Sequence, residues 1–473
     1  MLTYQDLLKV KEKNNESLVH DFILRAINEH RSSEMYKIAL DASEYDKQKN
    51  TTILQYVKYI YTSLNSRAID TIASNNKLCS NFFHRLNTQR NTYSLGNGVD
   101  FVKDDTKGKL GKNFDNVIKD IGYDSLIHGL AFGFWNNNKL EGFNLLEFVP
   151  LLDEETSALR GGIRFWQLND NKPMYIRFFE EDGVTKLKKE KGKDLEEVEP
   201  KRKYLKIVKS TEIGGIEGIE YENYSGFPII PLYGSKLRQS TLVGMKSQID
   251  AYDLIRSGFA NDLEDCAEIY WIINNASGMD SRDIAEFRAK LKLNHMATVD
   301  DEQSSVVPYT QEIPSTSRTQ FLDIIRNGIY EDFGGLDVHT ISATSTNDHI
   351  DAAYQPLDEE ADDYEGELIK FIHNLLELQG IEDDPIFKRN RISNHKEQSE
   401  MVLAASEYLD DRTILSKLPF VSIDEVDEIL KRKDEESAEQ FGDAGIGPQE
   451  EPQQTAILLE NNQAEGGEGD LVE

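Results

Sequence analysis

Apolar residues recur in steps of three and four along the stretch from Val243 to Ile273, and this spacing predicts one long helix. Charged residues fill most of the remaining positions, as in a helix that packs on a core through one face. Periodicity alone favours a surface helix of a globular domain. The apolar positions are Met245, Ile249, Tyr252, Ile255, Phe259, Leu263, Cys266 and Tyr270.

The same spacing predicts helices on both sides of this stretch. Near the C-terminus, Ser422 and Glu425 have the spacing of a capping box, which marks a helix start. The predicted helices before the long one cover residues 2–30, 52–74, 75–93 and 110–129, and those after it cover 281–293, 317–333, 357–380, 394–409, 411–418 and 422–439.

From Leu130 the period changes to two, which is typical of strands. Residues 130–152 read as two strands joined by an asparagine-rich turn, and short β segments follow at 161–168, 173–189 and 201–210. Pro228 and Pro231 predict an extended entry to the long helix. The fold class expected from these patterns is α+β, mainly helical.

Charge changes the picture of possible partners. The chain of 473 residues has 85 acidic and 53 basic side chains, a net charge of −32. A protein that binds duplex DNA by neutralising its phosphates should be basic. This charge balance therefore excludes a protein whose whole surface binds DNA phosphates. It leaves either simple solubility or a surface along which nucleic acid slides without sticking.

Two further compositional features bear on location. No run of 18 or more apolar residues is present, so no membrane-spanning helix is expected, and the N-terminus lacks the pattern of a signal peptide. The two cysteines, Cys79 and Cys266, have no CxxC companion and suit a reducing compartment.

Catalytic signatures are missing: no phosphate-binding loop, nucleophile elbow or zinc-protease helix occurs in the sequence. No catalytic residue, metal site or cofactor is therefore expected, and the chain is predicted not to be an enzyme. The one candidate for a hard cation is the acidic cluster 358–367. It leaves open an alternative, a metal-dependent nuclease using Asp358, Glu359, Asp362 and Asp363.

Two polar segments stand apart from the predicted elements. The stretch from Gly334 to about Pro356 is too long for a simple connection, and loops of that length are usually functional or disordered. Residues 441–473 carry eight acidic side chains and no basic one, which predicts a disordered acidic tail.

The order of several stretches resembles the portal proteins of tailed bacteriophages, in particular those of Gram-positive siphophages. The resemblance rests on NNKLCSNFFHRLNTQRNTYSLGNGVDF at 75–101, on the hairpins that open with LAFGFWNNNKLEGFNLLEFVPLL at 130–152, on FPIIPLYG leading into the long helix, and on SEMVLAASEYLDDRTILSKLPF at 399–420. Together these stretches span about residues 30–435.

The resemblance implies a portal fold that forms a dodecameric ring at a capsid vertex, through which DNA enters during packaging and leaves during ejection. It divides the chain into a wing (1–235), a first stem helix (236–273), a clip (274–316), a second stem helix (317–333), a tunnel loop (334–356), a long helix behind that loop (357–384), a wing closure and crown (385–440) and the tail (441–473).

The resemblance also implies site residues and partners. The partners would be double-stranded DNA, the terminase large subunit, head-completion or adaptor proteins, and the major capsid and scaffolding proteins, in the virion and in the host cytoplasm during assembly. A non-viral adaptor or scaffold protein remains a further alternative. The tunnel-loop residues would be His339, Thr340, Ser342, Thr344, Asn347 and His349, and the stem-packing residues Ile249, Tyr252, Phe259, Leu263, Phe321 and Ile325.

Overall fold

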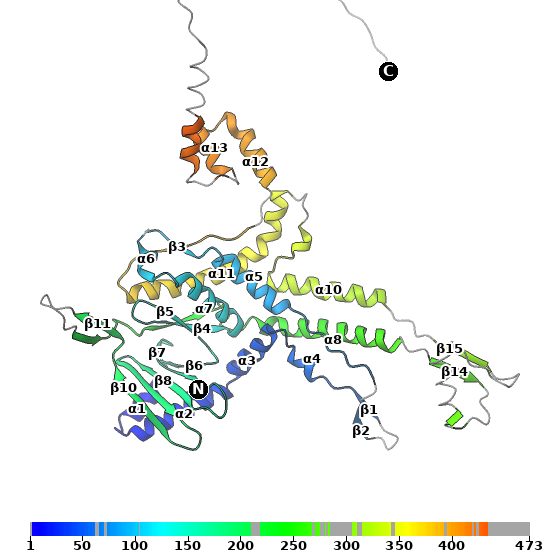
Figure 1. Ribbon diagram of the computed structural model, residues 1–473, viewed down its shortest axis with the longest axis horizontal. Helices are drawn as coiled ribbons and strands as arrows, with labels where there is room; N and C mark the ends of the chain where they lie inside the picture. Colours follow the sequence, from blue (N-terminus) through cyan, green and yellow to red (C-terminus); the bar gives the residue numbers. More distant parts are fainter. Residues whose placement is uncertain are drawn as a thin grey trace, which may run out of the picture. The chain divides into compact units, whose positions relative to one another are not determined.

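The computed structural model contains two compact units, residues 1–392 and 393–473, and each is described by itself. Figure 1 shows that the first unit combines helices with several small antiparallel sheets, which confirms the α+β class. The structure describes residues 2–61, 66–70, 73–103, 105–209, 218–266, 270–274, 280, 282–283, 305–309, 315–341, 346–391, 395–418, 421 and 425–433.

A five-stranded antiparallel sheet is built from residues 148–202, with the strand order β10-β9-β8-β7-β6. Helices α1 (Tyr4–Lys11) and α2 (Glu16–Ser32) cover one face, where Leu7, Phe22 and Ile23 are buried against strand side chains such as Ile163 and Phe178. The strands are β6 (Phe148–Leu152), β7 (Leu159–Trp166), β8 (Met174–Glu180), β9 (Gly183–Lys189) and β10 (Leu195–Arg202).

A second sheet, of order β13-β4-β5, lies at the centre of the first unit. Its strands are β4 (Leu130–Trp135), β5 (Leu140–Asn144) and β13 (Ile229–Tyr233). The hairpin predicted at 130–152 is therefore confined to 130–144, where β4 also pairs with the proline-containing segment, while residues 148–152 belong to the five-stranded sheet as β6. Helices α7 (Phe114–His128) and α11 (Asn347–Leu378) share one core with this sheet. Burying each large apolar side chain there contributes about 1.5–3 kcal/mol.

Further helices and several short strands complete the first unit. Gly129 ends α7 with a φ of +81°, and a Cβ at this position would collide with the backbone of Gln239 and Ser240. The remaining elements are α3 (Glu34–Asp46), α4 (Thr51–Gln55), β1 (Tyr59–Tyr61), β2 (Arg67–Ile69), α5 (Phe82–Leu95), β3 (Val99–Phe101), α6 (Thr106–Leu110), β11 (Leu205–Lys209), β12 (Gly218–Glu222), α8 (Leu242–Cys266), β14 (Tyr270–Asn274), β15 (Ser305–Tyr309), α10 (Ser315–Phe333), η1 (Val338–Thr340) and β16 (Pro385–Phe387).

In the second unit, the described residues form α12 (His395–Ala404), η2 (Ala405–Glu407), α13 (Asp411–Lys417) and a helical stretch at 425–433. The side chain of Asp410 accepts a hydrogen bond from the backbone of Thr413 and caps α13. These helices match the predicted ones at 394–409 and 411–418. Ser422 and the tail 441–473 lie outside the described residues, as does nearly all of the predicted helix 281–293.

One predicted helix in the N-terminal part is wrong. The described residues of 52–74 form α4 and the strand pair β1–β2, because the aromatic and β-branched run at Tyr59–Tyr61 pairs with Arg67–Ile69. The helix predicted at 75–93 starts only at Phe82. Similarly, 2–30 and 110–129 are each interrupted, by Asn14 and Gly111 with positive φ.

The long helix is also shorter than predicted. It ends at Cys266, and Tyr270–Asn274 forms a strand that pairs with Ser305–Tyr309. Trp271, Ile272 and Ile273 favour a strand once a partner strand is available. Helix α11, by contrast, is longer than predicted. It begins ten residues before Leu357, is capped by Thr346 and continues through Pro356. Pro356, where the polar stretch was expected to end, lies inside the helix.

None of the described helices is long and apolar enough to cross a membrane.

The buried His128, in the last turn of α7, makes stability depend on pH. Its pKa is lowered to about 4, because burial disfavours the charged imidazole, and the Asp124 backbone and the negative charge of Asp46 offset this only in part. A lowered pKa gives stability that is present above the unfolded-state value near 6.5 and is lost as pH falls through 4. Between pH 7 and 4, the wild type should lose about 2–3 kcal/mol more unfolding free energy than His128→Leu.

Equilibrium denaturation of both proteins at several pH values measures this difference. The partly exposed His20, replaced by leucine, is the matched control and should follow the wild type. Parallel pH curves for wild type and His128→Leu would contradict the prediction.

Candidate functional site

Helices α8 and α10 lie side by side, and their inner halves share a core (Figure 1). Ile249 is buried there, and Tyr252 and Ile325 are partly buried against the same cluster. The cluster also includes Phe82, whose ring meets the Tyr252 ring edge-on with centroids 5.0 Å apart. Three of the six predicted stem-packing residues are therefore brought together within one subunit.

The other three predicted stem residues lie on the outer halves of the two helices and are less covered. Leu263 is 54% exposed and Phe321 is 49% exposed. Phe259 is partly buried, and the guanidinium of Arg318 lies over its ring. The guanidinium carbon is 5.8 Å from the ring centroid, within the reach of about 6 Å that is usual for a cation–π contact. Arg318 also pairs with Asp262 of α8, which ties the two helices together at this level.

Two further apolar residues of these helices were not among the predicted stem-packing residues. Leu254 of α8 is 45% exposed and Ile324 of α10 is 66% exposed. The signal was available, since both are apolar residues within the helices predicted at 243–273 and 317–333. Together with Leu263 and Phe321 they are the half-exposed apolar side chains that we call the stem apolar surface. This surface has more than one side, because Leu254 and Leu263 are about two and a half helical turns apart on α8.

One side of α8 carries polar rather than apolar buried residues. Asp253, Ser257 and Asn261 recur every fourth residue and are at most 5% exposed. Their side-chain oxygens accept hydrogen bonds from the backbone N–H groups of residues 80, 78 and 76, at 2.9, 2.9 and 2.5 Å. This ladder holds the segment 76–80 extended along the helix, which explains why the predicted helix at 75–81 does not form.

The predicted tunnel-loop residues fall into three groups. His339 and Thr340 lie in η1, where Asp337 accepts a hydrogen bond from the His339 backbone at 3.2 Å. Asn347 and His349 lie in the first turn of α11 rather than in a loop. Ser342 and Thr344 lie outside the described residues.

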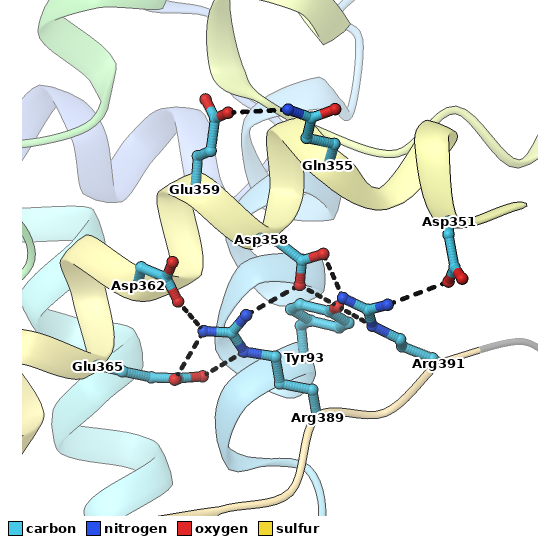
Figure 2. Close-up of polar contacts among 9 residues, drawn as sticks. All are labelled: Tyr93, Asp351, Gln355, Asp358, Glu359, Asp362, Glu365, Arg389 and Arg391. Atoms are coloured by element: carbon cyan, nitrogen blue, oxygen red, sulfur yellow. Dashed lines mark hydrogen bonds and ion pairs between the residues drawn. The ribbon is translucent and has the colours of Figure 1, made fainter. Parts of the chain in front are cut away.

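Two arginines beyond α11 bind the acidic face of that helix, as Figure 2 shows. Arg389 binds both oxygens of Glu365, with Nε 3.1 Å and Nη2 2.9 Å away, and also contacts Asp358 at 2.9 Å and Asp362. Arg391 contacts Asp358 and lies 3.1 Å from Asp351. The two guanidiniums thus anchor the segment of β16 to the helix.

Tyr93 of α5 completes this cluster. Its hydroxyl donates to Asp358 at 2.7 Å and accepts from Nε of Arg391 at 2.8 Å. Burial acts to raise the pKa of Asp358, but the hydrogen bonds from Tyr93 and the arginines outweigh it and leave this pKa below its ordinary value. The bond to Glu365 raises the pKa of Arg389, so the cluster stays charged at neutral pH.

These contacts remove the structural basis of the nuclease alternative. Asp358 and Asp362 bind arginines, the Asp363 carboxylate lies 2.8 Å from Nζ of Lys236, and Glu359 accepts from Gln355 at 3.4 Å. Within the part of the chain that the structure describes, no group of three or more histidine, cysteine or acidic residues could hold a metal ion. The acidic cluster therefore serves internal ion pairing.

Comparison with known proteins identifies the family. The family described as "Phage portal protein, SPP1 Gp6-like" matches residues 27–439, which is most of the chain. The chain belongs to this phage portal protein family. The resemblance seen in the order of the sequence stretches is thereby confirmed.

One phage portal protein and two chains from solved neck structures are individually similar to this chain. The portal protein of Clostridium phage phiCD119 is 28% identical over 218 residues, which cover 44% of this chain and 48% of that protein. The chain thus spans about half the length of this relative. Among solved structures, a chain from the neck of a native GTA particle, computed with C12 symmetry, has a TM-score of 0.42 at 10% identity and covers 72% of this chain and 89% of that chain. A chain from the neck of an empty GTA particle, computed with C6 symmetry, has a TM-score of 0.43 at 9% identity, with 71% and 88% covered.

The portal chain's arginine cluster was not found from the sequence, although a signal exists. Asp351, Asp358, Asp362 and Glu365 follow each other at helical spacing on one face, and Arg389 and Arg391 alternate in an extended segment. Such an acidic stripe facing two alternate cations predicts a contact only once the two segments are known to be neighbours.

The Arg389–Glu365 pair should contribute measurably to stability. Both side chains are mostly buried, at 22% and 13% exposure, and a bidentate pair of this kind is worth about 1–2 kcal/mol of coupling. A double-mutant cycle with Arg389→Gln and Glu365→Gln, read by equilibrium unfolding, measures it. The exposed pair Arg25–Glu29 is the control and should couple by less than about 0.5 kcal/mol. Equal couplings in both cycles would contradict the expectation.

Proposed function

We propose that this protein assembles into a dodecameric ring at a capsid vertex and acts as the conduit for DNA packaging and ejection. The match of the portal family over residues 27–439 carries this proposal. In this role the subunit is a structural component and not an enzyme, so ATP hydrolysis belongs to the packaging motor. The family match also disfavours a non-viral adaptor or scaffold protein.

The stem apolar surface supports assembly through α8 and α10. Leu254, Leu263, Phe321 and Ile324 are 45–66% exposed in the single chain. An apolar surface that one subunit leaves open is typical of a protein–protein interface. In a ring, each subunit presents one such surface to a different surface of its neighbour, and the rotation closes the assembly.

We assign the other parts of a portal subunit to the regions around the helix pair α8 and α10. Residues 274–316, between α8 and α10, form the proposed clip that docks the terminase large subunit and later the head-completion or adaptor proteins. Residues 1–235 and 385–440 form the wing and crown, which face the major capsid and scaffolding proteins. The segment 334–346 and the first turn of α11 form the proposed tunnel loop, with His339, Thr340, Ser342, Thr344, Asn347 and His349 near the DNA. The protein would reside in the virion, after assembly in the host cytoplasm.

Assembly should depend on the stem apolar surface. Phe321→Ser combined with Ile324→Ser removes two half-exposed apolar side chains, so ring formation should fall strongly while unfolding free energy changes by less than about 1 kcal/mol. Native mass spectrometry and negative-stain microscopy measure the fraction of subunits in rings.

Leu168, which is 86% exposed in the turn after β7, provides the control for a lost surface apolar residue. Leu168→Ser should form rings like the wild type. Undiminished rings in the Phe321/Ile324 variant would exclude this surface from the subunit interface, and a wild type that stays monomeric at every concentration and salt would exclude the ring itself.

DNA handling should depend on the proposed tunnel loop. Deleting residues 342–345 leaves both η1 and the Thr346 cap of α11 in the sequence, so rings should still form. Phage particles assembled with this variant should package or retain less DNA, measured as DNA per particle. Normal DNA content in particles with the shortened segment would remove the role of this loop.

A further inference from the structure

A cavity of about 240 Å³ lies where α5, α8, α10 and η1 meet, at the inner end of the stem helices. Since a water molecule occupies about 30 Å³ of the liquid, the cavity has room for a small ligand with part of its hydration shell. Its lining consists of Ser80, Asn81, Phe82, Arg85, Tyr252, Arg256, Arg326, Tyr330 and His339. Three arginines and a histidine line this space in a chain with a net charge of −32.

Two of the three guanidiniums have no ion-pair or hydrogen-bond partner among the residues that the structure describes. Arg326 lies 2.6 Å from Asp337 and is thereby paired. Arg85 and Arg256 are exposed, and neither has an ion pair or hydrogen bond to any residue that the structure describes. This contrasts with Arg389 and Arg391, whose guanidiniums are each shared by more than one carboxylate.

The N-terminus of α5 opens at the same cavity. Asn81 precedes the helix but makes no side-chain capping bond, so the N–H groups of the first turn lack the usual acceptor. A helix N-terminus of this kind carries a partial positive charge and favours an anion.

The carboxylates that touch the lining are already engaged. Asp253 accepts from Ser80 N at 2.9 Å through one oxygen and from Asn50 Nδ2 at 2.9 Å through the other. Asp337 pairs with Arg326 and caps η1. Neither carboxylate forms an ion pair with Arg85 or Arg256, and Asp253 acts on Arg256 only through its charge at longer range. Among the described residues, the two guanidiniums therefore keep their hydrogen-bond donors available.

We propose that this cavity is a binding site for a phosphate group. Arg85 and Arg256 would bind its oxygens through their planar guanidinium forks, a geometry that matches phosphate. The first-turn N–H groups of α5 would supply further donors. The phosphate could belong to a free anion or to the backbone of DNA, and only the DNA source rests on the proposed conduit function.

Titration calorimetry of the full chain with inorganic phosphate and with pyrophosphate tests the site. We expect saturable binding that weakens at least tenfold in the double variant Arg85→Gln, Arg256→Gln. The control variant Arg25→Gln, Arg160→Gln removes two surface arginines far from the cavity in sequence and should bind like the wild type. If the double variant unfolds, the single variants Arg85→Gln and Arg256→Gln take its place.

Absence of saturable phosphate binding to the wild type, or equal binding by the double variant, would overturn the proposal. Acetate binding more tightly than phosphate would also overturn it and would indicate a carboxylate ligand from another protein. A short DNA duplex that competes with phosphate supports the backbone as the source, whereas phosphate binding without such competition supports a free anion. Ring formation by the double variant, checked by microscopy, separates failure of this site from failure of the proposed assembly.

Discussion

The burial of one face of α11 is the constraint on which the first unit depends. Tyr364, Leu368, Phe371 and Leu375 are at most 1% exposed and pack in the core that the central sheet and α7 also line. Inside that core, the Tyr364 hydroxyl donates to Asn91 of α5 at 2.8 Å. Because α11 is fixed on this side, its acidic side faces Tyr93, Arg389 and Arg391, and the segment of β16 is held to the same helix. One helix therefore positions α5, the central sheet and the chain that leads out of the unit.

Helix α8 combines two kinds of contact that a single apolar stripe does not reveal. Ile249 and Met245 are buried with α5 and α10, whereas Asp253, Ser257 and Asn261 fix the extended segment 76–80 through its N–H groups. The extended segment in turn delivers Phe82 to the start of α5, beside the cavity of Arg85 and Arg256. The polar stripe of α8 thus determines where α5 begins and why its N-terminus lies open.

Sequence reasoning succeeded where the signal is local and failed where a distant partner decides. The helix at 317–333 is nearly as predicted. The long periodic runs at 357–380 and 130–152 are helical and extended as predicted, although α11 begins ten residues earlier and 130–152 forms three strands instead of two. At 75–81 and Tyr59–Tyr61 the helical spacing was overridden by hydrogen bonds to α8 and by strand pairing with Arg67–Ile69. The family followed from the order of the stretches, but Arg85, Arg256 and Arg326 are too far apart in sequence for their shared cavity to be visible there.

The charge balance of the chain also takes on a different meaning. The acidic stripe of α11 is paired within the chain, since Asp358, Asp362 and Glu365 are bound by Arg389, and Asp363 by Lys236. Carboxylates paired at 2.8–2.9 Å project little field beyond their partners in salt solution. In the proposed conduit, a surface along which DNA slides must therefore use other acidic side chains. Conversely, Arg85 and Arg256 have no ion pair with a residue that the structure describes, so the proposed phosphate site is a local cavity and not the surface of this acidic protein as a whole.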